Sequence, residues 1–94
     1  MQEKIEEALG KIRRIEWSFG DGVTEKIFQD DGGQNYLSYV RRSDVIEIIG
    51  SIAGIRVDYK KIGERERLAV SGDPDITDFL FDQIQIFQAL AITA

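Results

Sequence analysis

The sequence predicts an α+β domain in which a five-stranded antiparallel sheet has helices packed on one face, in the order α-β-β-β-α-β-β-α. Three observations lead to this prediction. Apolar and polar residues alternate over several short segments, which is the two-residue period of a half-buried strand. Turn sequences such as Gly20-Asp21-Gly22 separate these segments. Apolar residues with the 3.6-residue period of an amphipathic helix occur at the start, middle and end of the chain.

The first half of the chain predicts one helix and three strands. Residues 2–9 carry an apolar stripe at helical spacing, and Gly10 is expected to end this helix. Alternation over residues 11–19 then predicts a strand that turns Trp17 toward the core. Two further strands, separated by a glycine-rich turn, are expected at residues 23–29 and 36–41.

The middle of the chain predicts a helix over residues 43–53. Ser43 or Asp44 would cap its amino terminus, and Glu47 would complete a capping box. Gly54 suits the left-handed residue that follows a helix. One broad face of the helical wheel collects the apolar residues Val45, Ile46, Ile48, Ile49, Ile52 and Ala53.

Two strands and a long helix complete the predicted fold. Residues 55–61 alternate clearly, and residues 65–71 begin with charged side chains that would protect a sheet edge. Asp73 followed by Pro74 is a strong helix start, because it combines a capping acid with proline at the first helical position. That helix is expected to continue to about residue 91.

Length and composition limit the classes of function that this protein can have. The 94 residues suffice for a single domain, 1–94, with one core in which Trp17, Ile49 and Phe87 are expected to be buried. Cysteine and histidine are absent, which removes the commonest metal ligands and the usual general base. A net charge of −5 disfavours general nucleic-acid binding. No apolar run approaches the ~18 residues of a membrane span, and the acidic first residues do not resemble a signal peptide, so we expect a cytoplasmic protein.

Motifs for catalysis and for metal or phosphate binding fail on spacing. Asp30 and Asp31 lie in an expected turn, and the spacing of a calcium loop fails when it is counted from Asp21 or from Asp73. The segment from Gly50 to Gly54 lacks the lysine of a phosphate-binding loop. The serines have no histidine to activate them. We therefore expect no enzymatic activity, no cofactor and no metal site.

Sheet-face nucleic-acid binding is the alternative function. Basic pairs are available to bind phosphates, and Trp17, Tyr36, Tyr39 and Tyr59 are available to stack on bases. The strands at residues 55–61 and 67–71, with the turn at 72–75 and the helix after it, resemble the last part of a KH domain. This resemblance covers less than half of the chain and implies nucleic-acid binding. The basic Gly-x-x-Gly loop of that family is not matched.

The last helix predicts a protein-binding surface. Phe81 and Ile92 fall outside its main apolar arc, where a surface helix normally carries polar residues. Residues 43–94 carry a net charge of −4, against −1 for residues 1–42, which favours a basic or amphipathic protein partner. We expect a two-fold homodimer through this helix, and the predicted interface residues are Asp78, Phe81, Asp82, Gln85 and Ile92.

The predicted element order and the acidic charge resemble those of type III secretion chaperones, which are small dimeric proteins. The resemblance implies a chaperone-like role in binding other proteins. A small inhibitor, such as a phage-encoded one that blocks a nucleic-acid-binding surface with its acids, is the second option. The predicted function is therefore that of a small acidic protein-binding domain, whether adaptor, chaperone-like protein or inhibitor.

Overall fold

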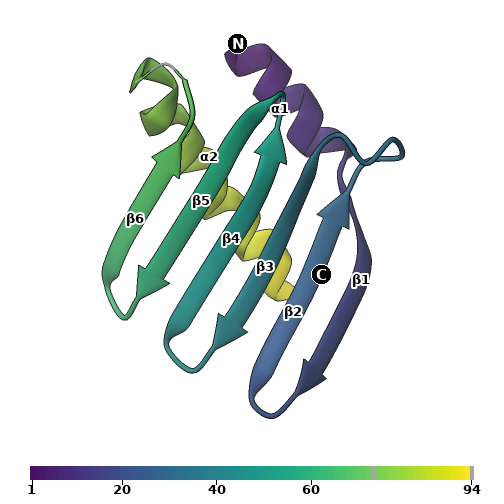
Figure 1. The fold of residues 1–94 in the computed structure, drawn as a ribbon, viewed down its shortest axis with the longest axis vertical. Helices are drawn as coiled ribbons and strands as arrows, with labels where there is room; N and C mark the ends of the chain where they lie inside the picture. The colour runs from purple at the N-terminus through teal and green to yellow at the C-terminus, as the bar shows by residue number, and fades with distance from the viewer. Residues whose placement is uncertain (73, 94) are drawn as a thin grey trace.

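The computed structural model describes residues 1–72 and 74–93, which form a six-stranded antiparallel sheet and two helices (Figure 1). Every strand pairs with its neighbour in the chain, so the sheet order is β1-β2-β3-β4-β5-β6. Both helices pack on the same face of the sheet. The elements are α1 (Gln2–Lys11), β1 (Arg13–Gly20), β2 (Val23–Gln29), β3 (Tyr36–Arg42), β4 (Val45–Ile52), β5 (Ile55–Ile62), β6 (Arg65–Val70) and α2 (Pro74–Thr93).

The predicted five-stranded sheet with a central helix is wrong, because the segment expected to be that helix is strand β4. This strand lies inside the sheet and pairs with β3 and β5 along its whole length. Ser43, expected to cap a helix, belongs to the turn between β3 and β4 and has φ 55°. Ala53 and Gly54 form the next turn, and both have positive φ, as two-residue hairpins prefer.

The reason for this error is the composition of β4. Five of its eight residues are valine or isoleucine, whose branched side chains favour strands over helices. Because apolar residues lie on both faces of β4, the alternation that marks a half-buried strand is hidden. The same residues happen to share an arc on a helical wheel.

The other elements lie close to their expected positions. The strands at both ends of the sheet, and the turn at Asp21 and Gly22, match the prediction. Helix α1 continues through Gly10, its expected end, to Lys11, two residues beyond the predicted range 2–9. Helix α2 begins at Pro74, whereas Asp73, its expected cap, lies outside the described residues.

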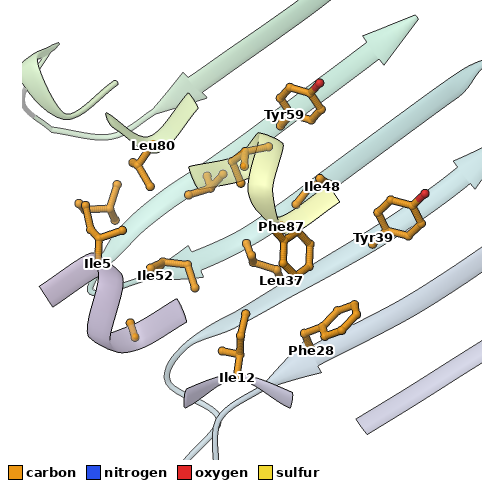
Figure 2. Close-up of a cluster of buried hydrophobic side chains, with 14 of the residues drawn as sticks. Ile5, Ile12, Phe28, Leu37, Tyr39, Ile48, Ile52, Tyr59, Leu80 and Phe87 are labelled. Atoms are coloured by element: carbon orange, nitrogen blue, oxygen red, sulfur yellow. The ribbon is translucent and has the colours of Figure 1, made fainter. Parts of the chain in front are cut away.

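The core lies between the two helices and one face of the sheet (Figure 2). Phe87 of α2 is buried, as predicted, and its ring meets that of Phe28 edge to face with centroids 4.9 Å apart. Ile49 was predicted to be buried but is 41% exposed, whereas its neighbour Ile48 is fully buried. Adjacent residues of a strand point to opposite faces, and only the Ile48 face is covered by helices.

Candidate functional site

Strand β1 is an exposed edge of the sheet. It pairs only with β2, and all eight of its residues are exposed. Its exposed side chains include three large apolar ones, Ile15, Trp17 and Phe19. A long, exposed, apolar edge offers unpaired backbone groups together with apolar side chains, and most proteins avoid this combination. The opposite edge, β6, is shorter and begins Arg65-Glu66-Arg67, as the sequence predicted.

Trp17 was predicted to be buried, yet 53% of its surface is exposed. It pairs with Lys26 of β2, which pairs with the buried Tyr39, so Trp17 does lie on the face that carries the helices. The Lys26 ammonium donates a hydrogen bond to the carbonyl of Ala91, near the end of α2. Helix α2 therefore reaches β2 but not β1 (Figure 1), and nothing among the described residues covers Trp17 fully.

A bulge divides β1 into two parts. The pairing with β2 shifts between Arg14 and Glu16, which leaves Ile15 without a partner residue. Beyond the bulge the alternation is regular, and Phe19 joins Trp17 on the helix side. Phe19 is 70% exposed. The Arg14 guanidinium carbon lies 6.0 Å from the centre of the Trp17 ring, within the range of a cation–π contact.

Two apolar side chains of α2 are also exposed on the side of the sheet that carries Trp17 and Phe19. On a helical wheel Ile86 and Leu90 fall within the apolar arc of the last helix, which predicts that they are buried, but both are exposed. They line a depression of ~380 Å³ between α1, α2 and β2, and Arg14 lies at the same depression. Arg14 thus links them to Trp17. We call Trp17, Phe19, Ile86 and Leu90 the apolar strip.

The buried face of α2 is rotated about the helix axis relative to the face that the helical wheel predicts. The helix buries Gln88 instead of Ile86, and the Gln88 side-chain nitrogen has no hydrogen-bond partner among the described residues. Gln88 lies toward Tyr59, whose phenolic pKa it lowers slightly against larger opposing effects. The wheel correctly identified an apolar helix but not the side that faces the sheet, since Ile86 and Leu90 are as apolar as the residues actually buried.

The five predicted interface residues divide into two groups. Asp78, Asp82 and Ile92 are exposed on α2. Phe81 is half-buried and packs on the Tyr59 ring with centroids 6.4 Å apart. The Gln85 amide donates a 3.1 Å hydrogen bond to the Glu66 carboxylate. Two of the five therefore already have contacts within the protomer, and the five do not form one continuous apolar surface with the apolar strip.

A polar cluster joins β5, β6 and α2. The Tyr59 hydroxyl donates a 2.9 Å hydrogen bond to the same oxygen of Glu66 that accepts from Gln85. Burial of the ring raises the pKa of Tyr59, and the hydrogen bond to the negatively charged Glu66 raises it further. These contacts fix α2 against the sheet near β6.

Because of this cluster, we expect the free energy of unfolding to depend on pH in the alkaline range. Above the ordinary tyrosine pKa of 10.0, the unfolded chain loses the Tyr59 proton while the folded protein retains it, so the folded state is progressively disfavoured. The stability advantage of the natural protein over Tyr59→Phe should therefore be constant up to about pH 9 and shrink as the pH rises through about 10 and above. Urea unfolding of both proteins across this range measures it. A constant difference would show that Tyr59 ionises equally in both states, and a growing difference would show that it ionises more readily in the folded state.

Asp30, one of the two acids predicted to lie in a turn, stabilises the loop between β2 and β3. The Asp30 carboxylate accepts hydrogen bonds from the Asn35 side chain at 2.8 Å and from the Gln34 backbone at 3.0 Å. The Asn35 contact is the main reason why the pKa of Asp30 lies below its usual value. In the described part of the chain, acidic side chains form no group of three or more that could hold a metal ion.

The sheet face without helices carries mixed charges. Four basic residues of β3, β5 and β6 lie in two neighbouring cross-strand rows on this face. In one of these rows, the Lys60 ammonium lies 3.9 Å from the Glu47 carboxylate of β4. Tyr36 is the one aromatic residue of the four proposed for base stacking that lies on this face. Tyr39 and Tyr59 are buried in the core, and Trp17 is on the helix side. The basic residues are Arg42, Lys60, Arg65 and Arg67.

No protein-family model, curated protein or solved structure matches the chain. The helix that carried the resemblance to type III secretion chaperones is strand β4, so the element order of that family is not present. Residues 50–54, compared above with a phosphate loop, lie in β4 and the following turn. None of the helices in the described residues is both long enough and apolar enough to cross a membrane.

Sequence reasoning missed the apolar strip and the exposed edge. The signal for the edge was present, because the first strand of an uninterrupted meander must lie at one side of its sheet. Had residues 43–53 been assigned as a strand, β1 would have been identified as an edge that has apolar residues where β6 has charged ones. The exposure of Ile86 and Leu90 had no comparable signal.

Proposed function

We propose that this protein is a non-catalytic protein-binding domain and that β1 is the edge through which it binds. The observation that carries the proposal is the full exposure of β1 together with its large apolar side chains. An extended segment of a partner can add to such an edge, where main-chain hydrogen bonds supply affinity and side-chain contacts supply specificity. The proposal keeps the expectation of a cytoplasmic protein, which comes from the sequence alone.

The apolar strip supports the same proposal. Trp17 and Phe19 would contact side chains of an added strand on the helix side, and Ile86 and Leu90 would extend that contact to α2. Trp is among the residues that most often dominate binding energy when a partner covers it. An adaptor, a chaperone-like protein and an inhibitor would all use such a surface. The acidic helices favour a partner segment that is amphipathic or basic.

The sheet-face alternative has weaker support. A surface that binds single-stranded nucleic acid combines stacking aromatics with a positive groove. Of the four aromatic residues considered for stacking, only Tyr36 is available on this face, and Glu47 partly neutralises the basic rows. We therefore propose protein binding alone.

The test compares a β1 variant with a variant of similar chemistry elsewhere. Trp17→Ser combined with Phe19→Ser should lower the affinity for a protein partner at least tenfold, because two aromatic contacts are lost. Ile62→Ser, at an exposed apolar residue on the helix-free face, should leave the affinity unchanged. Partners captured by the tagged protein from its host would be purified and titrated against all three forms.

Hydrogen exchange provides an independent measurement. In a complex that uses β1, the amides of residues 13–20 should exchange more slowly than in the free protein, because strand addition engages unpaired amides. Equal losses of affinity in the β1 variant and in Ile62→Ser, with no added protection in β1, would overturn the proposed binding edge.

A further inference from the structure

We infer that the strand added to β1 is β1 of a second copy of this chain, paired antiparallel about a two-fold axis at Ser18. This inference rests on the proposed function, because it names the partner of the same edge. The result would be a continuous sheet of twelve strands with the helices of both copies on one side.

The bulge limits which part of β1 can pair. At Ile15 the regular alternation is interrupted, and bulges disrupt the addition of a strand. The regular part of the edge is therefore residues 16–20. The centre of this segment is Ser18. An antiparallel pair centred there uses every regular residue of both copies.

The residues brought opposite one another in this register are compatible. Trp17 of each copy lies opposite Phe19 of the other, which gives two aromatic pairs on the helix side. Ser18 lies opposite Ser18, a small polar pair on the helix-free side. Glu16 lies opposite Gly20. Every pair joins residues of the same sheet face, and no like charges are opposed.

Neighbouring registers are less favourable. Centring the pair on Glu16 opposes two carboxylates directly, and like charges directly opposite are destabilising. Centring it on Trp17 reduces the regular pairing to three residues and brings the bulged Ile15 opposite Phe19. The register at Ser18 is the one that combines full length with matched faces.

Charges at the edge also favour a second copy. The protein as a whole carries −5, but β1 itself carries two arginines and one glutamate, so the edge is not acidic. In the proposed register, Asp21 in the turn after β1 falls opposite Ile15 of the other copy, one position from Arg14, and symmetry repeats this approach of opposite charges at the other end. The apolar strips of the two copies would adjoin across the axis. Trp17 and Phe19 of each copy would then be covered by Phe19 and Trp17 of the other.

A single cysteine tests the register. The chain has no cysteine, so Ser18→Cys carries the only thiol. Residues directly opposite in an antiparallel pair have Cα atoms about 4.5–5.5 Å apart, which a disulfide can span. On mild oxidation, Ser18→Cys should form a covalent dimer at least tenfold faster than Ala69→Cys, an equally accessible control on edge β6. Glu16→Cys should also be slow, because the two Glu16 positions are separated along the strands.

Light scattering tests the association itself. At ~100 µM, far above a micromolar dissociation constant, the natural protein should have the mass of a dimer. Phe19→Lys should raise the dissociation constant at least tenfold while the circular dichroism spectrum stays native, because a lysine on an edge strand opposes pairing. Ile62→Lys is the matched control on the helix-free face, and it should remain dimeric.

The outcomes separate this inference from the proposed function. A monomeric natural protein at ~100 µM, with Ser18→Cys no faster to cross-link than Ala69→Cys, overturns self-pairing. If a foreign partner is then still captured in a Trp17- and Phe19-dependent way, the proposed function stands without the dimer. Faster cross-linking of Glu16→Cys than of Ser18→Cys overturns the register, and a dimer that tolerates Phe19→Lys overturns the use of β1.

Discussion

Gly50→Ala should destabilise the protein by about 3 kcal/mol, the largest effect expected of any single methyl group in the sheet. Gly50 lies in β4, where it pairs with Leu37 of β3 and Val57 of β5. A Cβ atom at this position would lie 2.0 Å from the Tyr36 carbonyl oxygen and 2.9 Å from the Leu37 Cα. These are main-chain atoms inside the sheet, so they cannot rotate away, and β3 and β4 would have to separate.

Urea unfolding of Gly50→Ala against Gly20→Ala measures this effect. Gly20 also lies in a strand, but a Cβ there would meet nothing within 4 Å. Gly20→Ala should therefore change stability by less than about 1 kcal/mol. If the two variants unfold at the same urea concentration, the close approach of β3 to β4 at Gly50 is not present in solution.

Ile48→Ala should cost roughly 2–5 kcal/mol, whereas Ile49→Ala should cost about 1 kcal/mol or less. The two isoleucines are adjacent in β4 and chemically identical. Ile48 is fully buried between the sheet and the helices, while Ile49 points to the face without helices. Truncating Ile48 leaves a cavity in the core, and truncating Ile49 removes a side chain that already contacts water.

This pair also distinguishes strand from helix. In the helix predicted for residues 43–53, Ile48 and Ile49 would share the buried face and both truncations would cost several kcal/mol. Equal large losses for the two variants would contradict β4 as a strand. The ratio between them is therefore a direct measurement of local structure, obtained from two unfolding curves.

Sequence patterns predicted local structure well where one face of an element was clearly polar. Alternation identified β5, and the proline at residue 74 marked the start of α2. The same reasoning failed at β4 because this strand, unlike β5, has apolar residues on both faces. Glu47 three residues after Asp44 resembled a capping box, although the backbone there forms a hairpin turn.

The candidate site was harder to predict because exposure is a property of the whole fold. The alternation of β1 correctly placed Trp17 and Phe19 on one face, and that face does carry the helices. Whether a helix reaches them depends on the direction in which α2 crosses the sheet, and that direction comes from packing at Leu80, Ile84 and Phe87. No local pattern encodes it, so Trp17 was expected in the core.

The meander order of the strands has a consequence for how the chain folds. Each strand pairs with the segment just before or after it, and most connections are two-residue turns, so the contact order within the sheet is low and little chain entropy is lost at each step. The hydrogen bond from Lys26 to Ala91 instead joins positions 65 residues apart. From this topology we expect hairpin formation to spread along the sheet before α2 docks across it, so that the docking of α2 would be the late step that excludes water from the core.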